Sequence, residues 1–248
     1  MRLYEQLPKG LPDDFLPDLA MSLNTLASML SDLGRREEAL AKAQGAVRLY
    51  EQLAKAGPDA FLPNLAASLN NLANLLSELG RREEALTKAQ EALRLYEQLA
   101  KPRPDAFLPG LAMSLLNLAN RLRDLGRRDE AFAKAHDAMR LYEQLAKVRP
   151  DAFLSALAKS CGARGAILRD MGRHTEATAS FAQGLQTLTP LFQKMPPAFG
   201  PLMSRLLQGY VEATQQAKQE PDKALLAPVI EVFKKLKQDR GSSDASLP

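Results

Sequence analysis

The chain has 248 residues, 46% of them apolar, which is enough to bury a large core. One cysteine excludes an internal disulfide, and no apolar run approaches the roughly 18 residues of a membrane-spanning helix, so we expect a soluble, cytoplasmic protein that makes no membrane contact. The formal net charge is +4 with basic and acidic residues interleaved, which is only a weak indication of an anionic partner.

The opening of the chain, MRLYEQLPKG, contains a phrase that occurs three more times. The phrase RLYEQLAK begins at Arg48, Arg94 and Arg140, at intervals of 46 residues. A related copy at Arg2 is in the same register, but the residues that precede the phrase in later copies are missing before it. Residues 1–12 are therefore predicted to be a truncated half-repeat, which is too short to stay helical without packing on the next hairpin.

The 46-residue period extends through most of the chain. It relates three sets of identical residues: Phe15, Phe61, Phe107, Phe153 and Phe199; Gly34, Gly80, Gly126 and Gly172; Tyr4, Tyr50, Tyr96 and Tyr142. Without gaps, 59–104 matches 105–150 at 33 of 46 positions and 13–58 at 34. Such similarity predicts one structural unit copied in tandem: repeats 1 to 3 over these ranges, in chain order, and a divergent repeat 4 at 151–196.

Within a unit, the apolar residues form two runs with spacings of three, four and seven. In repeat 2 these are Leu65, Leu69, Leu72, Ala73, Leu76 and Leu79, then Ala85, Ala89, Ala92, Leu93, Tyr96 and Ala100. Such spacing is typical of helices with one buried face, and no run alternates with period two, so we expect an all-α protein. Each unit then forms two antiparallel helices of about 20 residues, and stacking of these hairpins into a solenoid buries both stripes.

The ends of the two helices in repeat 2 are also predicted. Asp59 is expected to be the N-cap of the first helix, with Pro63 in its first turn. Gly80 is expected to end this helix, because glycine accepts the left-handed C-cap conformation. The second helix should start at the sequence RREEA, where Glu83 and Glu84 lie near its positive end.

The pattern decays toward the C-terminus. Pro190 in repeat 4 is expected to end the second helix early, and Lys218 stands at the fifth glycine position. A final helix should start after Asp222 and contain a kink at Pro228. We predict a degenerate repeat 5 with a terminal cap at 197–239, followed by a flexible tail at 240–248.

The segment LNNLANLLSELGRREEALTKAQEA resembles a tetratricopeptide repeat. The residues at the packing positions of that family are Leu69, Leu72, Ala73, Leu76, Gly80, Ala85, Ala89 and Ala92. Ala89 departs from the usual aromatic residue, which repeat 4 supplies as Phe181. The usual repeat has about 34 residues, so both helices are lengthened here, as in kinesin light chains, and the long period resembles bacterial arrays. The resemblance implies a right-handed α-solenoid, a superhelix of stacked hairpins, and leaves the ligand open.

The same resemblance indicates where a partner binds, because the first helix of each unit lines the concave groove of such arrays. The groove residues carried over from the family are Asn24, Thr25, Ser28, Asn70, Asn71, Asn74, Asn117, Asn120, Arg123, Lys159 and Arg169. Asparagine has both donors and acceptors for an extended peptide backbone, and the later units add cations that suit an acidic peptide. We therefore predict a non-enzymatic scaffold that binds a peptide or partner protein in this groove.

Two alternatives remain open. The incomplete opening suggests a self-assembly module that associates through its N-terminal face, or a fragment of a larger repeat-containing regulatory protein. Nucleic acid could instead meet the arginine pairs at one edge, which are Arg35–Arg36, Arg81–Arg82 and Arg127–Arg128. Glutamates follow the first two pairs directly and no aromatic residue lies among the basic ones, which weighs against nucleic acid.

Residues that commonly carry chemistry are few. His136 stands where repeat 2 has Gln90 and is expected on a helix surface, whereas Cys161 replaces Leu69 and is expected in the core. These residues and His174 are not spaced as metal ligands, and no catalytic set or phosphate loop is evident. We expect no cofactor, no metal and no enzymatic activity.

Overall fold

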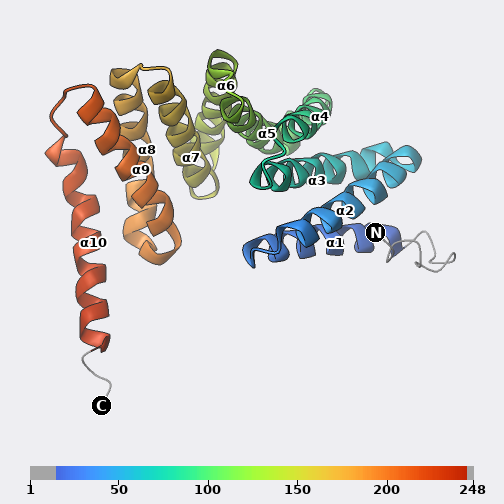
Figure 1. Cartoon of the computed structure of the whole chain (residues 1–248), viewed down its shortest axis with the longest axis horizontal. Helices are drawn as coiled ribbons and strands as arrows, with labels where there is room; N and C mark the ends of the chain where they lie inside the picture. Colours follow the sequence, from blue (N-terminus) through green and yellow to red (C-terminus); the bar gives the residue numbers. More distant parts are fainter. Residues whose placement is uncertain (1–14, 245–248) are drawn as a thin grey trace. The chain divides into compact units, whose positions relative to one another are not determined.

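The structure is a computed structural model that describes residues 15–244 of the chain. Within this range it contains ten helices and no strand, as the sequence predicted (Figure 1). Their bounds are α1 Leu16–Asp32, α2 Arg36–Ala56, α3 Pro58–Glu78, α4 Arg82–Ala100, α5 Pro104–Asp124, α6 Arg128–Val148, α7 Pro150–Asp170, α8 His174–Lys194, α9 Pro196–Gln216 and α10 Lys223–Asp244. The predicted half-repeat at 1–12 lies outside the described residues, and α10 continues into the predicted tail.

The chain divides into an N-terminal unit, Met1–Gly126, and a C-terminal unit, Arg127–Pro248. In the N-terminal unit each of the helices α1 to α5 packs on the next, and the alternate helices α1, α3 and α5 also touch in sequence order. One apolar core runs through these helices. In the C-terminal unit, α6 to α9 pack in the same consecutive way, and α10 packs on α8. The predicted stacking of helix hairpins is thus confirmed within each unit.

Alanine dominates the contact between the two helices of a hairpin. Ala73 of α3 and Ala85 and Ala89 of α4 are completely buried. Small side chains at these positions let the helix axes approach closely, and the leucines around them fill the remaining space. The tyrosines Tyr50, Tyr96 and Tyr142 are buried as well, and burial raises the pKa of Tyr142 to about 12.

The first helices end as predicted. Gly80 has a φ of 76°, and its N–H donates to the carbonyl oxygen of Ser77 at 2.9 Å. The next N–H, that of Arg81, donates to the carbonyl oxygen of Leu76 at 2.8 Å. These bonds satisfy carbonyls that the helix itself leaves unpaired. Lys218 takes the same left-handed conformation in the fifth copy, with a φ of 55°.

The predicted N-cap at Asp59 is wrong. Helix α3 begins at Pro58 with Gly57 as its N-cap, so Asp59 lies in the first turn and Pro63 lies inside the helix. Proline has the φ angle of a helix already and needs no donor at the first helical position, which explains the earlier start. The N–H that Pro63 lacks would have bonded the carbonyl of Asp59, an exposed residue whose carbonyl can bond water instead.

The predicted early end of the helix at Pro190 is also wrong. Helix α8 continues through Pro190 to Lys194. The next two residues, Leu191 and Phe192, are both buried, and Phe192 packs on Phe233 of α10 with ring centroids 4.9 Å apart. Burial of these side chains therefore holds the last turn in place despite the hydrogen bond that proline removes.

Phe181 changes the packing of repeat 4. It stands where repeat 2 has Ala89, and its ring is buried. Glycines compensate for its size: a Cβ added at Gly165 would lie 2.9 Å from the ring, and one added at Gly209 would lie 2.4 Å from it. The aromatic ring thus occupies space that these glycines leave open.

This compensation predicts opposite effects for two glycines of α9. Gly209→Ala should destabilise the chain by about 1–3 kcal/mol, because the new methyl group overlaps the Phe181 ring. A Cβ at Gly200 would have its nearest neighbour at 3.9 Å. Gly200→Ala should therefore stabilise by about 0.5–1 kcal/mol, the usual gain for alanine in a helix. Denaturant unfolding measures both, and equal effects would contradict the packing described.

Candidate functional site

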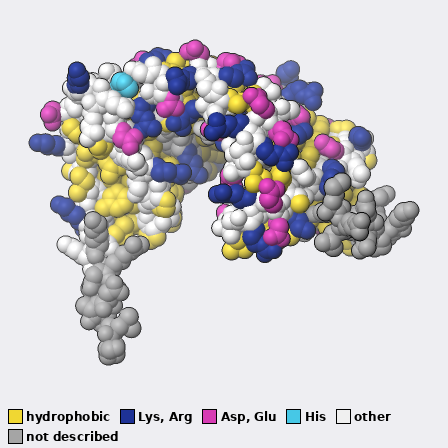
Figure 2. Space-filling view, in the orientation of Figure 1, with side chains coloured by type: hydrophobic (Ala, Val, Ile, Leu, Met, Phe, Trp, Pro, Cys, Tyr) yellow, Lys and Arg dark blue, Asp and Glu magenta, His cyan; other side chains and the backbone are white. Residues whose placement is uncertain are grey.

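The predicted groove residues all lie on first helices of repeats. Asn24, Thr25 and Ser28 are on α1, Asn70, Asn71 and Asn74 on α3, Asn117, Asn120 and Arg123 on α5, and Lys159 and Arg169 on α7. Most are exposed or half-buried. On the molecular face drawn in Figure 2, basic and acidic side chains are interspersed over both units, so neither charge dominates that face.

Side-chain hydrogen bonds connect the first helices of the N-terminal unit. They join Asn71 Nδ2 to Asn24 Oδ1 at 3.2 Å, Ser31 Oγ to Glu78 Oε2 at 2.9 Å, and Ser77 Oγ to Asp124 Oδ2 at 3.1 Å. Each bond joins residues 47 positions apart. This interval is one residue longer than the repeat, so corresponding edges of α1, α3 and α5 meet. The bonds form a polar seam along α1, α3 and α5.

A surface hollow of about 170 Å³ lies on this seam between α1 and α3. The residues lining it are Ala27, Ser28, Ser31, Asp32, Asn71, Asn74, Leu75 and Glu78. Ser28, Asn71 and Asn74 belong to the predicted site, whereas sequence reasoning missed Asp32 and Glu78. These two carboxylates give the hollow an acidic character. Arg36 approaches Glu78 only loosely, with Nε 3.9 Å from Oε2.

Asn70 does not belong to this surface. It is only 1% exposed, and its Nδ2 donates to Ser114 Oγ at 2.7 Å in the contact between α3 and α5. One residue corresponds to about 100° of rotation on a helix, so Asn70 and the neighbouring Asn71 face different directions. The placement of Asn70 in the groove is therefore corrected: it is a packing residue.

Arg121 is a polar residue of α5 that sequence reasoning missed. It stands where repeat 2 has Leu75, and only 13% of its side chain is exposed. Burial lowers the pKa of Arg121, against the opposing effect of Asp124 and Glu78. Its Nε lies 3.8 Å from Asp124 Oδ2. The departure from leucine at this repeat position was the signal that could have identified it.

In the C-terminal unit, the two predicted cations differ. Lys159 on α7 is exposed. Arg169 forms an ion pair with Glu212 of α9, and Glu212 also accepts a hydrogen bond from Gln208 Nε2 at 2.8 Å. The carboxylate of Glu212 therefore compensates the charge of Arg169.

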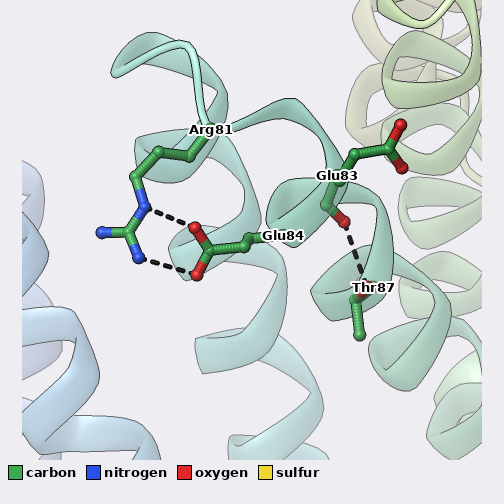
Figure 3. A network of polar contacts seen from close by, with 4 residues as sticks. All are labelled: Arg81, Glu83, Glu84 and Thr87. Carbon is green, nitrogen blue, oxygen red and sulfur yellow. Dashed lines mark hydrogen bonds and ion pairs between the residues drawn. The ribbon is translucent and has the colours of Figure 1, made fainter.

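The arginine edge has an internal partner at each repeat. Arg81 donates to Glu84 through Nε at 2.6 Å and Nη2 at 2.7 Å (Figure 3). The same two-bond pair recurs in the other repeats as Arg35–Glu38, Arg127–Glu130 and Arg173–Glu176. The hydrogen bond from Arg81 lowers the pKa of Glu84, so the carboxylate stays ionised. The first arginine of each pair at this edge therefore has a carboxylate partner within its own repeat.

Groups that could carry chemistry are isolated from one another. In residues 15–244 there is no cluster of three or more histidine, cysteine or acidic residues that could hold a metal ion. No described helix has the length and apolar character needed to cross a membrane. His136 is half-buried rather than on the surface and stacks on Phe132, with ring centroids 6.1 Å apart. Cys161 is buried as predicted, and burial raises the pKa of its thiol to about 12.

The thiol of Cys161 should therefore be unreactive in the native chain. We expect a thiol reagent at neutral pH to modify it only at the rate of unfolding, because the group is buried and protonated. A Val148→Cys variant is the matched control, since Val148 is 81% exposed, and should gain one thiol that reacts at once. Rapid modification of the unaltered chain under native conditions would show that α7 is packed differently.

Comparison with known proteins identifies the repeats. Residues 18–98 match a family model described as "Tetratricopeptide repeat", and residues 111–150 match a second model with the same description. No curated protein sequence matches the chain significantly. The two matched segments contain the polar seam of α1, α3 and α5.

Solved structures share the fold at low sequence identity. A protein described as a kinesin light chain with nearly identical TPR-like repeats, from Podosopora anserina, is 18% identical with a TM-score of 0.58, covering 89% of this chain and 97% of that chain. A second structure, of a variant of the same protein with one substitution, has 19% identity and a TM-score of 0.60, covering 91% and 98%. The Rap conjugation gene regulator of plasmid pLS20, in complex with a Phr peptide, has 15% identity and a TM-score of 0.52, covering 86% and 57%.

Proposed function

Because the chain is a tetratricopeptide-repeat protein, we propose that it is a non-enzymatic scaffold whose first helices bind an extended segment of a partner protein. The observation that carries the proposal is the hollow between α1 and α3, which exposes polar side chains on two helices in contact. The Rap structure, which shares the fold, was solved with a peptide and supports this kind of ligand. Helices position such side chains more precisely than loops do.

The charges around the hollow suggest the chemistry of the segment. Asp32 and Glu78 line it, and none of the lining residues is basic. Asn74 adds a side-chain amide that can donate to a peptide carbonyl and accept from a peptide N–H. This part of the surface thus suits a segment that offers donors, such as backbone amides and lysine or arginine side chains.

The expectation of an acidic peptide remains a separate proposal for the later repeats. Asn117, Asn120 and Arg123 of α5 are half-buried, and Lys159 of α7 is exposed. The ion pair between Arg169 and Glu212 weakens this proposal, since an acidic ligand would have to compete with the carboxylate already there.

A pair of charge-neutralising variants tests the hollow. Extended peptides are first selected from a display library against the full chain, and their Kd is measured by fluorescence anisotropy. Glu78→Gln should weaken binding about tenfold, because a hydrogen bond to a charged group contributes about 1–1.5 kcal/mol more than one to a neutral group. Glu97→Gln, the same change at an exposed residue of α4, should leave Kd unchanged.

Thermal unfolding provides the control for folding, and both variants should melt with the unaltered chain, because both glutamates are exposed and the amide oxygen of glutamine can still accept the bond from Ser31 Oγ. Equal Kd values for Glu78→Gln and the unaltered chain would place the peptide elsewhere. A Lys159→Glu variant then tests the acidic-peptide proposal: loss of binding there, with Glu78→Gln silent, would favour the later repeats over the hollow.

A further inference from the structure

Helix α1 presents an apolar face at one end of the N-terminal unit. Its members, here called the α1 end face, are Leu26 and Met29 of the helix together with Phe15 and Leu33, which flank it at its two ends. Leu26 is 40% exposed, Met29 58% and Leu33 72%. We propose that the α1 end face binds the outer face of α10 from a second copy of this chain, so that copies associate head to tail.

The repeats themselves indicate that this face is built to be covered. One repeat later, Leu72 and Leu75 of α3 occupy the positions of Leu26 and Met29, and they are 4% and 5% exposed. They belong to the core that α3 shares with α1 and α2. The side chains at these positions are therefore buried on α3, where the preceding hairpin packs on them, whereas they are exposed on α1.

The rim of the α1 end face is acidic. The sequence of α1 contains Asp18 and Asp32 and no basic residue. By repeat position both aspartates belong to the end face, and Asp32 also lines the hollow between α1 and α3, so it lies at the edge between the two surfaces. Asn64, the α3 counterpart of Asp18, donates to Tyr50 of α2, and Glu78, the counterpart of Asp32, accepts from Ser31 of α1. An occupant of this face therefore needs an apolar centre with basic residues on either side.

The outer face of α10 has these properties. A surface hollow there is lined by Lys223, Leu226, Ala227, Ile230, Glu231 and Lys234. Ile230 is 42% exposed, whereas the neighbouring Val229 is buried against the core of the C-terminal unit. Lys223 and Lys234 flank the apolar residues along the helix, and Glu231 between them is paired with Lys235 at 2.8 Å.

The spacing of the charges is compatible with direct pairing. Asp18 and Asp32 are 14 residues apart on α1, a rise of about 21 Å, and Lys223 and Lys234 are 11 apart on α10, a rise of about 17 Å. Pairing of two α1 end faces would instead set aspartates against aspartates. Opposite rim charges thus favour α10 of a second copy over α1 of a second copy.

A head-to-tail contact leaves one free face at each end of a dimer, so further copies can add and the average mass should rise beyond that of a dimer as concentration increases. Light scattering coupled to gel filtration measures this for the full chain. Salt should weaken the association, because it screens the rim charges. Leu33→Glu and Ile230→Glu should each yield monomers by blocking one of the two faces.

Mixing the two variants gives the decisive result. Leu33→Glu retains an intact α10 face and Ile230→Glu an intact α1 end face, so the mixture should form a one-to-one dimer that neither variant forms alone. Both side chains are exposed, so neither variant should change the melting temperature of the monomer.

Three results would overturn the proposal. A chain that stays monomeric at all concentrations has no such contact. Dimers of Ile230→Glu alone would mean that two α1 end faces pair with each other. A lowered melting temperature for Leu33→Glu would show that the chain itself covers this face.

Discussion

The close approach of helices at alanine positions is the constraint on which the rest of the structure depends. Ala73, Ala85 and Ala89 leave no exposed surface, so the two helices of this hairpin can shift little relative to each other. Where repeat 4 places Phe181 in this contact, Gly165 and Gly209 open the space that the ring fills. Repeat 4 thus accommodates a large residue because glycine replaces larger side chains on the helices that it meets.

This packing also determines which side chains of a first helix remain for binding. Most of α3 is covered by α4, its partner in the hairpin, and by helices of the neighbouring repeats. What remains accessible is a narrow edge that carries Asn71, Asn74 and Glu78. Polar bonds along that edge, such as Ser31 to Glu78, join one repeat to the next, so the candidate binding surface is also part of the contact between repeats. A ligand that bridges α1 and α3 would therefore bind a preformed surface, at low conformational cost.

The sequence predicted the helices and their glycine ends because these depend on local periodicity and on a single backbone conformation. Prediction from the sequence failed where contacts between different helices determine the structure. The helix continues through Pro190 because the buried residues next to it hold the last turn in place. Asn70 is buried because it points about 100° away from its neighbour Asn71 around the helix. The partner of Arg169 lies 43 positions away on another helix, and periodicity carries no information about such a pair. Arg121 was missed because it stands at a position where repeat 2 has Leu75, a residue of the apolar core.

A partner that binds along the first helices, at the edge that packing leaves free, should protect those helices alone. Hydrogen–deuterium exchange of the full chain, with and without a selected peptide, tests this most directly. Binding should slow exchange in α1 and α3 and leave α2 and α4 unchanged, because only the first helices line the hollow. Protection confined to α2 and α4 would contradict binding at this edge.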